Sequence, residues 1–462
     1  MNLRISTFKK FLKPGLGLAF LLTIHLPNVL SQETPVEKPT LQKTKLSNGL
    51  YLIYEIDKAF PTTFLQVLVK GGTGAVPEGK EGLAYLATRM TVEIPDRGKI
   101  REMMKQATRI SMRCFGDYSL INLKCLTENL EESLKVMAPI IQKPLFSGIR
   151  ISRIKEYMIH ISKSEEDDPI IVGKNAHLQS FFGDSAYGGA IFGTEESLKT
   201  IKKKDIEGFY ENHFAANNMI VAVSSDLEEK LLIEMIQRYF GKFPQNKWEA
   251  SKPAGPALPE ERQLSLEKDT KQTLVSMAFP LPELTAKNFV LAFMTENLLG
   301  KGVDSKLWSI RAKERLAYNV NSQVIYLRGG GIIRAYLETK NENKQKALES
   351  LKQVLRLLNE NGMSEEELQA TKIGSRANFL RLNETKEARV STLADFEALG
   401  LGYGFFDRFF AEVDAVSLEE INVFIKEILS PEKGVEVVVG PKSEESAPPP
   451  SQPYYLIQEP NT

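Results

Sequence analysis

The chain has 462 residues, of which 42% are hydrophobic and 26% are charged, and its 59 acidic residues balance its 59 basic ones. These proportions are typical of a soluble globular protein and exclude a disordered or membrane-embedded chain, and the length is enough for two or more domains. No basic stripe with interleaved aromatic residues stands out, so we expect no nucleic-acid partner.

The first 31 residues have the pattern of a secretory signal peptide. Basic residues from Arg4 to Lys13 precede an apolar run at 16–26, and Val29-Leu30-Ser31 offers a cleavage point. The run is shorter than the roughly 20 residues that span a bilayer. We therefore predict an exported protein whose signal peptide is cleaved, with no stable membrane anchor.

A hairpin opens the part of the chain that follows. We predict that residues 45–55 form two strands joined at Asn48-Gly49, a pair that favours a tight turn. A further strand is predicted at 63–69, and a helix begins near Gly82.

The only two cysteines lie in a second hairpin, whose strands we predict at 107–114 and 119–126, with the turn at Gly116-Asp117. In this register Cys114 lies opposite Ser119, and Cys125 is about six residues further along the ladder, a separation of roughly 20 Å. A disulfide requires Cα atoms within about 7 Å. We therefore predict two buried free thiols.

The two halves of the chain repeat one unit. Five residues at helical spacing in the first half have counterparts 214 positions later. The first set is Asn129, Leu134, Met137, Ile140 and Ile141, and the second set is Asn343, Leu348, Leu351, Val354 and Leu355. At the same offset Gly148 falls on Gly362. A helix and a strand, 205–209 and 219–224, then recur at an offset of 215. Internal duplication explains these matches better than a chance agreement of periodicity.

Strands followed by long helices in each half predict an α+β fold of two homologous domains, each a mainly antiparallel sheet covered by helices. Pro- and Gly-rich stretches set the boundaries. We predict a signal peptide (1–31), an N-terminal domain (42–246), a linker (247–261), a C-terminal domain (262–441) and a Pro/Ser-rich tail (442–462), which we expect to be disordered.

Three stretches in the first half resemble the opening of the insulinase-like, or pitrilysin-like, zinc metallopeptidases. They are Asn48-Gly49-Leu50, Val69-Lys-Gly-Gly-Thr-Gly74 and Gly82-Leu-Ala-Tyr-Leu-Ala-Thr-Arg-Met90. Members of that family carry H-x-x-E-H on the helix that starts at the third stretch, where two His bind zinc and the Glu polarises the attacking water. Here the three positions hold Tyr85, Thr88 and Arg89.

The family's third zinc ligand is a Glu some six residues before an Asp-Asp-Pro, and that position corresponds to Ile161. A small slip in register would bring in Glu156, Glu165 or Glu166 instead. No His would join them, because the three His after the signal peptide do not form a pair at helical spacing. They are His160, His177 and His213.

Each replacement in the motif removes a function. The Tyr85 phenol, with an ordinary pKa of about 10, is a poor zinc ligand at neutral pH. Thr88 has no carboxylate to act as a base. Arg89 is cationic and has no lone pair to offer, and we expect it to pair with Glu93 one turn on. We therefore expect no metal or other cofactor in this chain.

The resemblance continues in the second half at residues 298–307 and at Arg311-Ala-Lys-Glu-Arg-Leu-Ala-Tyr318. It implies that Arg311 and Tyr318 reach towards the substrate at a zinc site, where a guanidinium and a phenol can stabilise an oxyanion. It also implies that a short loop helps to admit extended peptides, and this loop contains Gly300, Gly302 and Ser305. Without the resemblance, Arg311 would be a solvated helix residue and Tyr318 a core aromatic at the start of a strand.

The resemblance covers residues 42–441 and is to the two-domain bacterial type, which includes heterodimers with one zinc-bearing subunit and one that carries only the Arg and Tyr. It implies a non-catalytic subunit in the periplasm, which supplies half of a closed chamber to a zinc-bearing homologue that cleaves peptides. One alternative is a structural or peptide-binding protein, like the core subunits of respiratory complexes that resemble this family. Another is a complete peptidase with an unorthodox metal site, which would have to bind stoichiometric zinc.

Overall fold

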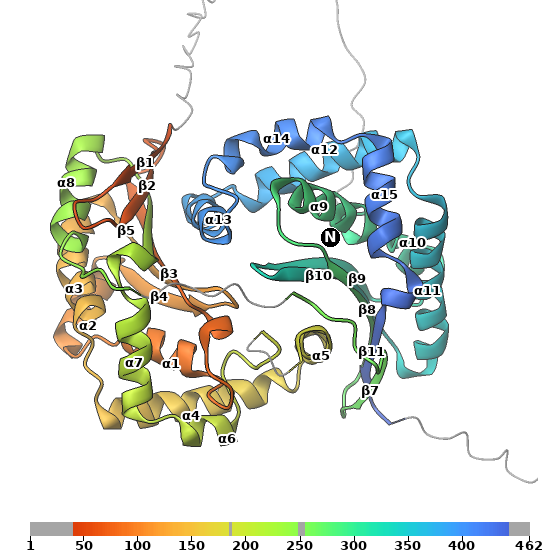
Figure 1. The fold of residues 1–462 in the computed structure, drawn as a ribbon, viewed down its shortest axis with the longest axis horizontal. Helices are drawn as coiled ribbons and strands as arrows, with labels where there is room; N and C mark the ends of the chain where they lie inside the picture. Colours follow the sequence, from red (N-terminus) through yellow and green to blue (C-terminus); the bar gives the residue numbers. More distant parts are fainter. Residues whose placement is uncertain (1–39, 184–186, 248–254, 443–462) are drawn as a thin grey trace, which may run out of the picture. The chain divides into compact units, whose positions relative to one another are not determined.

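Two mixed sheets, one from each half of the chain, carry the fold (Figure 1). The computed structural model describes residues 40–183, 187–247 and 255–442. We call residues 40–247 the first half and 255–442 the second half. The predicted signal peptide at 1–31, residues 248–254 of the predicted linker and residues 443–462 of the predicted tail lie outside the described residues.

The first sheet has the strand order β1-β2-β6-β3-β5-β4. Its strands are β1 (Leu41–Lys45), β2 (Tyr51–Ile56), β3 (Thr62–Lys70), β4 (Arg109–Cys114), β5 (Tyr118–Leu126) and β6 (Met219–Ser225). Only β2 and β6 are paired in parallel. Lys45 pairs with Tyr51 across the predicted Asn48-Gly49 turn, where Gly49 has the positive φ of 89° that such a turn needs.

The second sheet has the strand order β7-β11-β8-β10-β9. Its strands are β7 (Gln263–Glu267), β8 (Thr273–Leu281), β9 (Asn319–Leu327), β10 (Gly330–Thr339) and β11 (Val435–Gly440). Its only parallel pair, β7 and β11, takes the place of β2 and β6. Apart from β1, the two sheets therefore have the same topology, as the predicted duplication requires.

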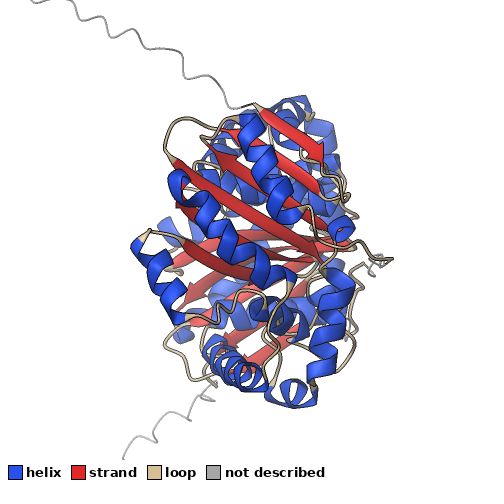
Figure 2. Ribbon diagram, turned by 90° about the vertical axis from the view of Figure 1, so that its left-hand side faces the viewer, coloured by secondary structure: helices blue, strands red, loops and turns tan. Residues whose placement is uncertain are grey.

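Helices lie against both sheets (Figure 2). Those of the first half are α1 (Leu83–Met90), α2 (Arg97–Lys105), α3 (Leu130–Gln142), α4 (Gly148–Glu165), α5 (Pro169–Phe182), α6 (Glu195–Thr200), α7 (Lys203–His213) and α8 (Glu229–Phe240). Those of the second half are α9 (Ala286–Gly300), α10 (Trp308–Ala312), α11 (Lys344–Asn361), α12 (Glu365–Leu382), α13 (Lys386–Leu399), α14 (Phe405–Ala415) and α15 (Leu418–Ile428). Among the described residues, no helix is long and apolar enough to cross a membrane.

Equivalent helices of the two halves confirm most of the predicted repeat. The start of α11 lies 214 residues after the start of α3, and α15 lies 215 residues after α7 at both ends. The predicted match of Gly148 with Gly362 is wrong. Helix α11 is five residues longer than α3 and the following loop is two residues shorter, so α12 begins 217 residues after α4.

One helix from each half packs on the sheet of the other half. Helix α13 lies on β3 and β6 of the first sheet, and α5 lies on β8 and β11 of the second. Helix α13 inserts Val390, Leu393 and Ala394 into an apolar cluster with strand residues of the first half. At Gly173 of α5 a Cβ would lie 2.3 Å from Leu274 Cδ2, so glycine is what allows α5 to approach β8. Helix α13 thus covers one face of the first sheet, and α5 covers one face of the second sheet.

The second hairpin has the predicted register. Cys114 pairs with Ser119 across β4 and β5, and both Cys114 and Cys125 are buried free thiols, which confirms the prediction. Burial raises the pKa of each thiol to about 11. Thiolates are therefore scarce at neutral pH, and neither cysteine is a reactive nucleophile.

Candidate functional site

Helix α1 carries the first of the predicted zinc-motif positions. Gly82 precedes it with a φ of 91°, and the helix packs against α4 and α7. The Tyr85 ring lies 4.7 Å from the ring of Phe192, centroid to centroid, and the side chain is 9% exposed. Burial raises the pKa of Tyr85 to about 12, further from the ionised state that could bind a metal.

The other two positions on α1 are also unsuited to metal chemistry. Thr88 is fully buried, and its hydroxyl oxygen has no hydrogen-bond partner. Arg89 forms the predicted ion pair with Glu93, at 2.6 Å, and Arg153 of α4 shares the same carboxylate. The guanidinium is thus tied to the neighbouring turn and to α4.

Ile161 lies half-buried on α4, three residues beyond Met158. Met158 belongs to the apolar cluster that contains Tyr85, and Ile161 does not. The α4 residue that acts electrostatically on Tyr85 is Tyr157. The assignment of Ile161 to the third ligand position therefore stays a prediction.

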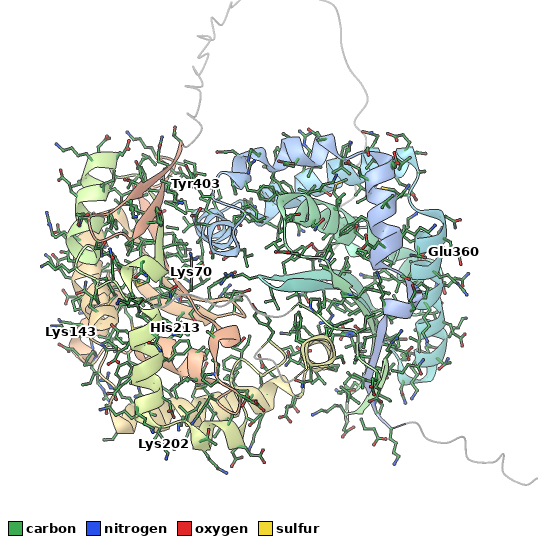
Figure 3. All side chains as sticks on the ribbon, in the orientation of Figure 1. Lys70, Lys143, Lys202, His213, Glu360 and Tyr403 are labelled. Carbon is green, nitrogen blue, oxygen red and sulfur yellow. The ribbon has the colours of Figure 1, made fainter. Side chains whose placement is uncertain are left out.

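These residues do not fit a zinc ion. Residues 40–183, 187–247 and 255–442 contain no group of three or more His, Cys, Asp or Glu that could hold a metal. His160 is exposed on α4, and the buried His177 ring nitrogen lies 2.7 Å from the Ser276 hydroxyl. His213 lies at the end of α7 (Figure 3), where its Nδ1 is 2.7 Å from the Phe209 carbonyl and burial lowers its pKa to about 4.

The purified chain is therefore expected to retain no zinc above background after dialysis, because no motif position holds a good zinc ligand at neutral pH. Inductively coupled plasma mass spectrometry measures this directly. As a positive control, a variant with Tyr85→His, Thr88→Glu, Arg89→His and Ile161→Glu should gain zinc if the four positions are assigned correctly. One zinc ion per unmodified chain would contradict the prediction and favour a peptidase with an unorthodox site.

Arg311 and Tyr318 both lie at the surface of the second half. Arg311, on α10, is exposed, and its guanidinium carbon lies 4.7 Å above the Trp308 ring. Tyr318 precedes the edge strand β9 and its side chain is 56% exposed, so the simpler prediction of a core aromatic is wrong. Its backbone N–H donates to the Glu338 carbonyl at 3.0 Å, which fixes the chain while the ring stays in solvent.

The predicted glycine loop lines a pocket of about 610 Å³ between the end of α9 and α12. Gly300 is the last residue of α9, and a Cβ there would lie 2.4 Å from the Ser322 backbone nitrogen, so it serves the packing of α9 on β9. Gly302, with a φ of 94°, lies in the loop itself. The Ser305 hydroxyl donates to the Gly302 carbonyl at 2.8 Å and closes the turn.

Sequence reasoning missed a half-buried ion pair beneath this loop. The Lys301 ammonium lies 3.1 Å from the Glu296 carboxylate and donates to the Asn321 side chain and the Ser322 carbonyl. Burial raises the pKa of Glu296, although Lys301 opposes the shift. The pair fixes the start of the loop to β9. A spacing of five residues is not a helical pairing pattern, so the sequence carried no signal for it.

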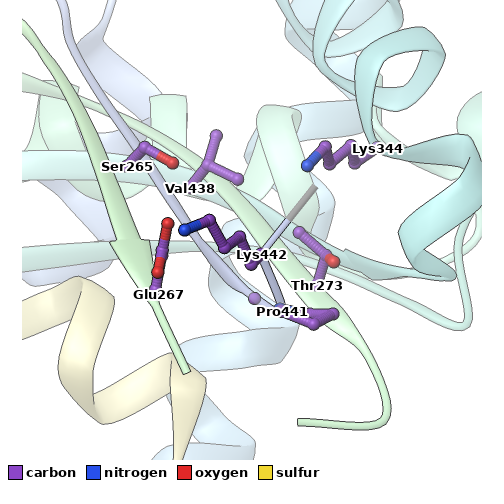
Figure 4. A pocket seen from close by; sticks show the side chains of 8 residues that line it. Ser265, Glu267, Thr273, Lys344, Val438, Pro441 and Lys442 are labelled. Carbon is purple, nitrogen blue, oxygen red and sulfur yellow. The ribbon is translucent and has the colours of Figure 1, made fainter. Parts of the chain in front are cut away.

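A second pocket, of about 560 Å³, was also missed (Figure 4). It lies at the ends of β7 and β11, where Glu267 and Lys442 extend into the same space and Lys344 lies nearby. In the first half, α8 follows β6 and covers the equivalent face, whereas the described chain ends two residues after β11.

Comparison with known proteins agrees with this geometry. Residues 200–374 match the family described as Peptidase M16 inactive domain. Over 385 residues the chain is 26% identical to the non-peptidase homolog YmxG of Helicobacter pylori. This alignment covers 81% of this chain and 88% of that protein. The chain therefore resembles the insulinase-like, or M16, peptidases in sequence and fold. Another relative is an uncharacterized zinc protease, YmxG, of Bacillus subtilis, which is 21% identical over 84% of this chain and 96% of its own length.

Solved structures show the same M16 fold. A peptidase M16 inactive domain from Pseudomonas fluorescens has a TM-score of 0.80 and 20% identity, covering 87% of this chain and 98% of that one. A protease from Helicobacter pylori has a TM-score of 0.78 and 18% identity, covering 87% and 100%. A chain of Complex III2 from Candida albicans has a TM-score of 0.76 and 18% identity, covering 87% and 96%. The M16 fold thus occurs both in a protein named a protease and in a respiratory complex.

The two groups of predicted M16 site residues belong to different halves. Tyr85, Thr88 and Arg89 lie on α1, and Arg311 and Tyr318 flank the turn between α10 and β9. In that turn Arg315 has a φ of 57°, a left-handed conformation that costs a non-glycine residue about 1–2 kcal/mol. Within the part of the chain that the structure describes, no hydrogen bond, ion pair or ring contact joins the two groups. In this respect the chain is similar to the inactive type of M16 domain.

Proposed function

We propose that this M16 homologue is the non-catalytic subunit of an exported zinc peptidase and offers Arg311 and Tyr318 to a zinc-bearing homologous partner. The observation that carries the proposal is the exposure of both side chains. A solvated arginine held on Trp308 and a phenol 56% exposed beside an edge strand have little to stabilise within their own chain. Both groups are free to meet a ligand from outside.

The chemistry of these two side chains suits a peptide carbonyl. A guanidinium and a phenol donate hydrogen bonds, and such donors stabilise the negative charge that develops on the carbonyl oxygen when water attacks. The family description of an inactive domain and the name of the Helicobacter pylori relative support a chain without activity of its own. The partner would then supply the zinc and the base, and this chain the oxyanion donors.

The remaining parts of the proposal rest on the sequence. The signal-like residues 1–31 support export, and the bacterial type of the resemblance supports the periplasm. Gly300, Gly302 and Ser305, which the resemblance assigns to the admission of peptides, line a pocket of about 610 Å³, and this supports peptide binding. The division into two domains at 247–261 stays a prediction.

The experiment is reconstitution with an H-x-x-E-H homologue from the same genome. Neither chain should cleave peptides efficiently alone, and the mixture should show zinc-dependent hydrolysis. Arg311→Ala and Tyr318→Phe should each lower kcat by about 10²-fold, the usual effect of removing one oxyanion donor. Lys313→Ala on the same exposed segment and Tyr51→Phe in the other half serve as matched controls and should retain activity.

Affinity capture, measured on the same variants, separates binding from chemistry. If the partner binds and the mixture stays inert, or if both substitutions leave turnover unchanged, the shared-site proposal fails. That outcome would favour the second candidate, a structural or peptide-binding protein. The specific observation in its favour is the structural likeness to a chain of Complex III2.

A further inference from the structure

Helix α12 exposes an apolar face along most of its length. Its inner side packs on α9 and α14. Its outer side carries residues three and four apart, namely Ala370, Ile373, Gly374, Ala377 and Leu380. Ile373 is 70% exposed and Leu380 is 60% exposed. A surface helix normally turns charged or polar residues to solvent on this side.

The first half provides an internal comparison. Helix α4 is the equivalent of α12 at an offset of 217, and the buried positions of the two helices correspond, as with Ile151 and Leu368. The α4 positions equivalent to the apolar face are also exposed, but they hold Arg153, Glu156, Tyr157, His160 and Lys163. The fold therefore does not require apolar residues at these positions.

The face of α12 has a ridge on one side and a hollow on the other. Ile373 and Leu380 form the ridge. Gly374 and Ala377 border the pocket of about 610 Å³ whose opposite wall contains Gly302 and Val303. The pocket has room for a branched apolar side chain. Ala370, Gly374 and Ala377 border it on α12, together with polar residues such as Glu367 and Asn378. The face thus carries an apolar projection beside a hollow whose α12 wall is partly made of small residues.

The charges at the two ends of this face are opposite. Glu366 lies near the start of α12 and Arg381 near its end, and both are exposed. Consider an antiparallel pair of α12 helices from two copies, with the two-fold axis passing between residues 373 and 374. In this pair Ile373 of one helix lies level with Gly374 of the other, and Ala370 lies level with Ala377. The same alignment would place Glu366 of each helix beside Arg381 of the other. The face is therefore complementary to itself at its centre and at its charged ends, while Leu380 would lie in the layer of Glu367.

We propose that the exposed face of α12 binds a second copy of this chain through a two-fold symmetric, antiparallel α12 pair. A two-fold interface uses the same patch on both subunits, so self-complementarity is the property it requires. The Ile373 side chain of each copy would enter the hollow beside Gly374 of the other. The inference goes beyond the proposed zinc-bearing partner and does not depend on it. Because Ile373 would enter the pocket that the glycine loop lines, self-association would compete with peptide binding there.

Sedimentation velocity of the full chain tests the proposal. One helix pair buries less than the roughly 800 Å² per partner of a standard interface, so the self-association should be weak and visible at about 100 µM. The expected species has twice the 51.9 kDa mass of one chain. Ile373→Glu should give a monomer, whereas Ile149→Glu, at an 86% exposed position on α4, should not. Circular dichroism checks that both variants fold.

A charge exchange identifies the partner as a second copy. Glu366→Arg and Arg381→Glu should each weaken self-association at least tenfold, because each sets like charges side by side. The double variant should recover it, because the pair is restored in reversed order. A chain that is monomeric at every concentration, an Ile373→Glu variant that still dimerises, or a double variant no stronger than the single ones would each overturn the proposal.

Discussion

Replacing Arg389 by methionine is expected to lower the free energy of unfolding by about 3–5 kcal/mol, the usual effect of breaking a buried ion pair from one side. Arg389 of α13 donates to the Glu55 carboxylate at 2.9 Å and to Asp57 at 2.5 Å, and both acids are buried in the first half. Without the guanidinium, two carboxylates would remain in a poorly hydrated place. The substitution would therefore weaken the packing of α13, which belongs to the second half, on the sheet of the first half.

Urea unfolding followed by circular dichroism measures this change. Arg376→Met is the matched control, because Arg376 forms an ion pair with Asp414 at 3.4 Å in which both side chains are about half exposed. Exposed pairs contribute about 0–1 kcal/mol. If the two substitutions destabilise the chain equally, Arg389 is not a buried anchor of α13.

Local patterns in the sequence were enough to predict the strands and the turns between them. Asn48-Gly49 fixed the first hairpin because few residue pairs accept its backbone conformation, and alternation around Gly116-Asp117 fixed the register that separates Cys114 from Cys125. Helical spacing located the repeat. These features depend on residues close together in the chain, which is where sequence patterns are informative.

Features that depend on distant segments could not be predicted. The exchange of α5 and α13 between the halves joins segments far apart in sequence, such as Arg389 and Glu55, and no local pattern marks it. The misplacement of Gly148 on Gly362 came from a helix of different length between two correctly matched elements. The exposure of Tyr318 could not be predicted for a similar reason. It depends on β9 being an edge strand, with no further strand beside it, and this is a property of the whole sheet.

At the predicted site, the most informative observation was that the side chains at the zinc-motif positions are not zinc ligands. Side-chain chemistry alone excludes Tyr85, Thr88 and Arg89 as a zinc site, and the structure adds that they are packed against Phe192 or paired with Glu93. The predicted Arg89–Glu93 pair is confirmed, since it depends only on helical spacing. The pair of Glu296 and Lys301 beneath the glycine loop required the fold, because β9 supplies its other partners.

Helix α13 also carries a half-buried acid, Asp395, that should make the stability of the chain depend on pH, because its Oδ1 is shielded from solvent. Asp395 lies against the first sheet with the Tyr118 hydroxyl as its hydrogen-bond partner, and burial raises its pKa from 3.8 to about 7. Between these two values the unfolded chain ionises this carboxyl while the folded chain keeps its proton. Folding is therefore linked to proton uptake, and the contribution of Asp395 to stability is full below pH 4 and is lost as the pH rises to about 7.

Asp395→Asn should remove this dependence, because the amide resembles the protonated acid and cannot ionise. The variant should gain stability relative to the unmodified chain as the pH rises from 4 to 8, by on the order of 4 kcal/mol over that range. Urea unfolding at each pH gives the difference. Tyr118→Phe, which removes the hydrogen bond that lowers the pKa of Asp395, should extend the loss of stability to higher pH. A difference between Asp395→Asn and the unmodified chain that stays constant with pH would mean that Asp395 ionises in the folded protein as an ordinary carboxyl group does.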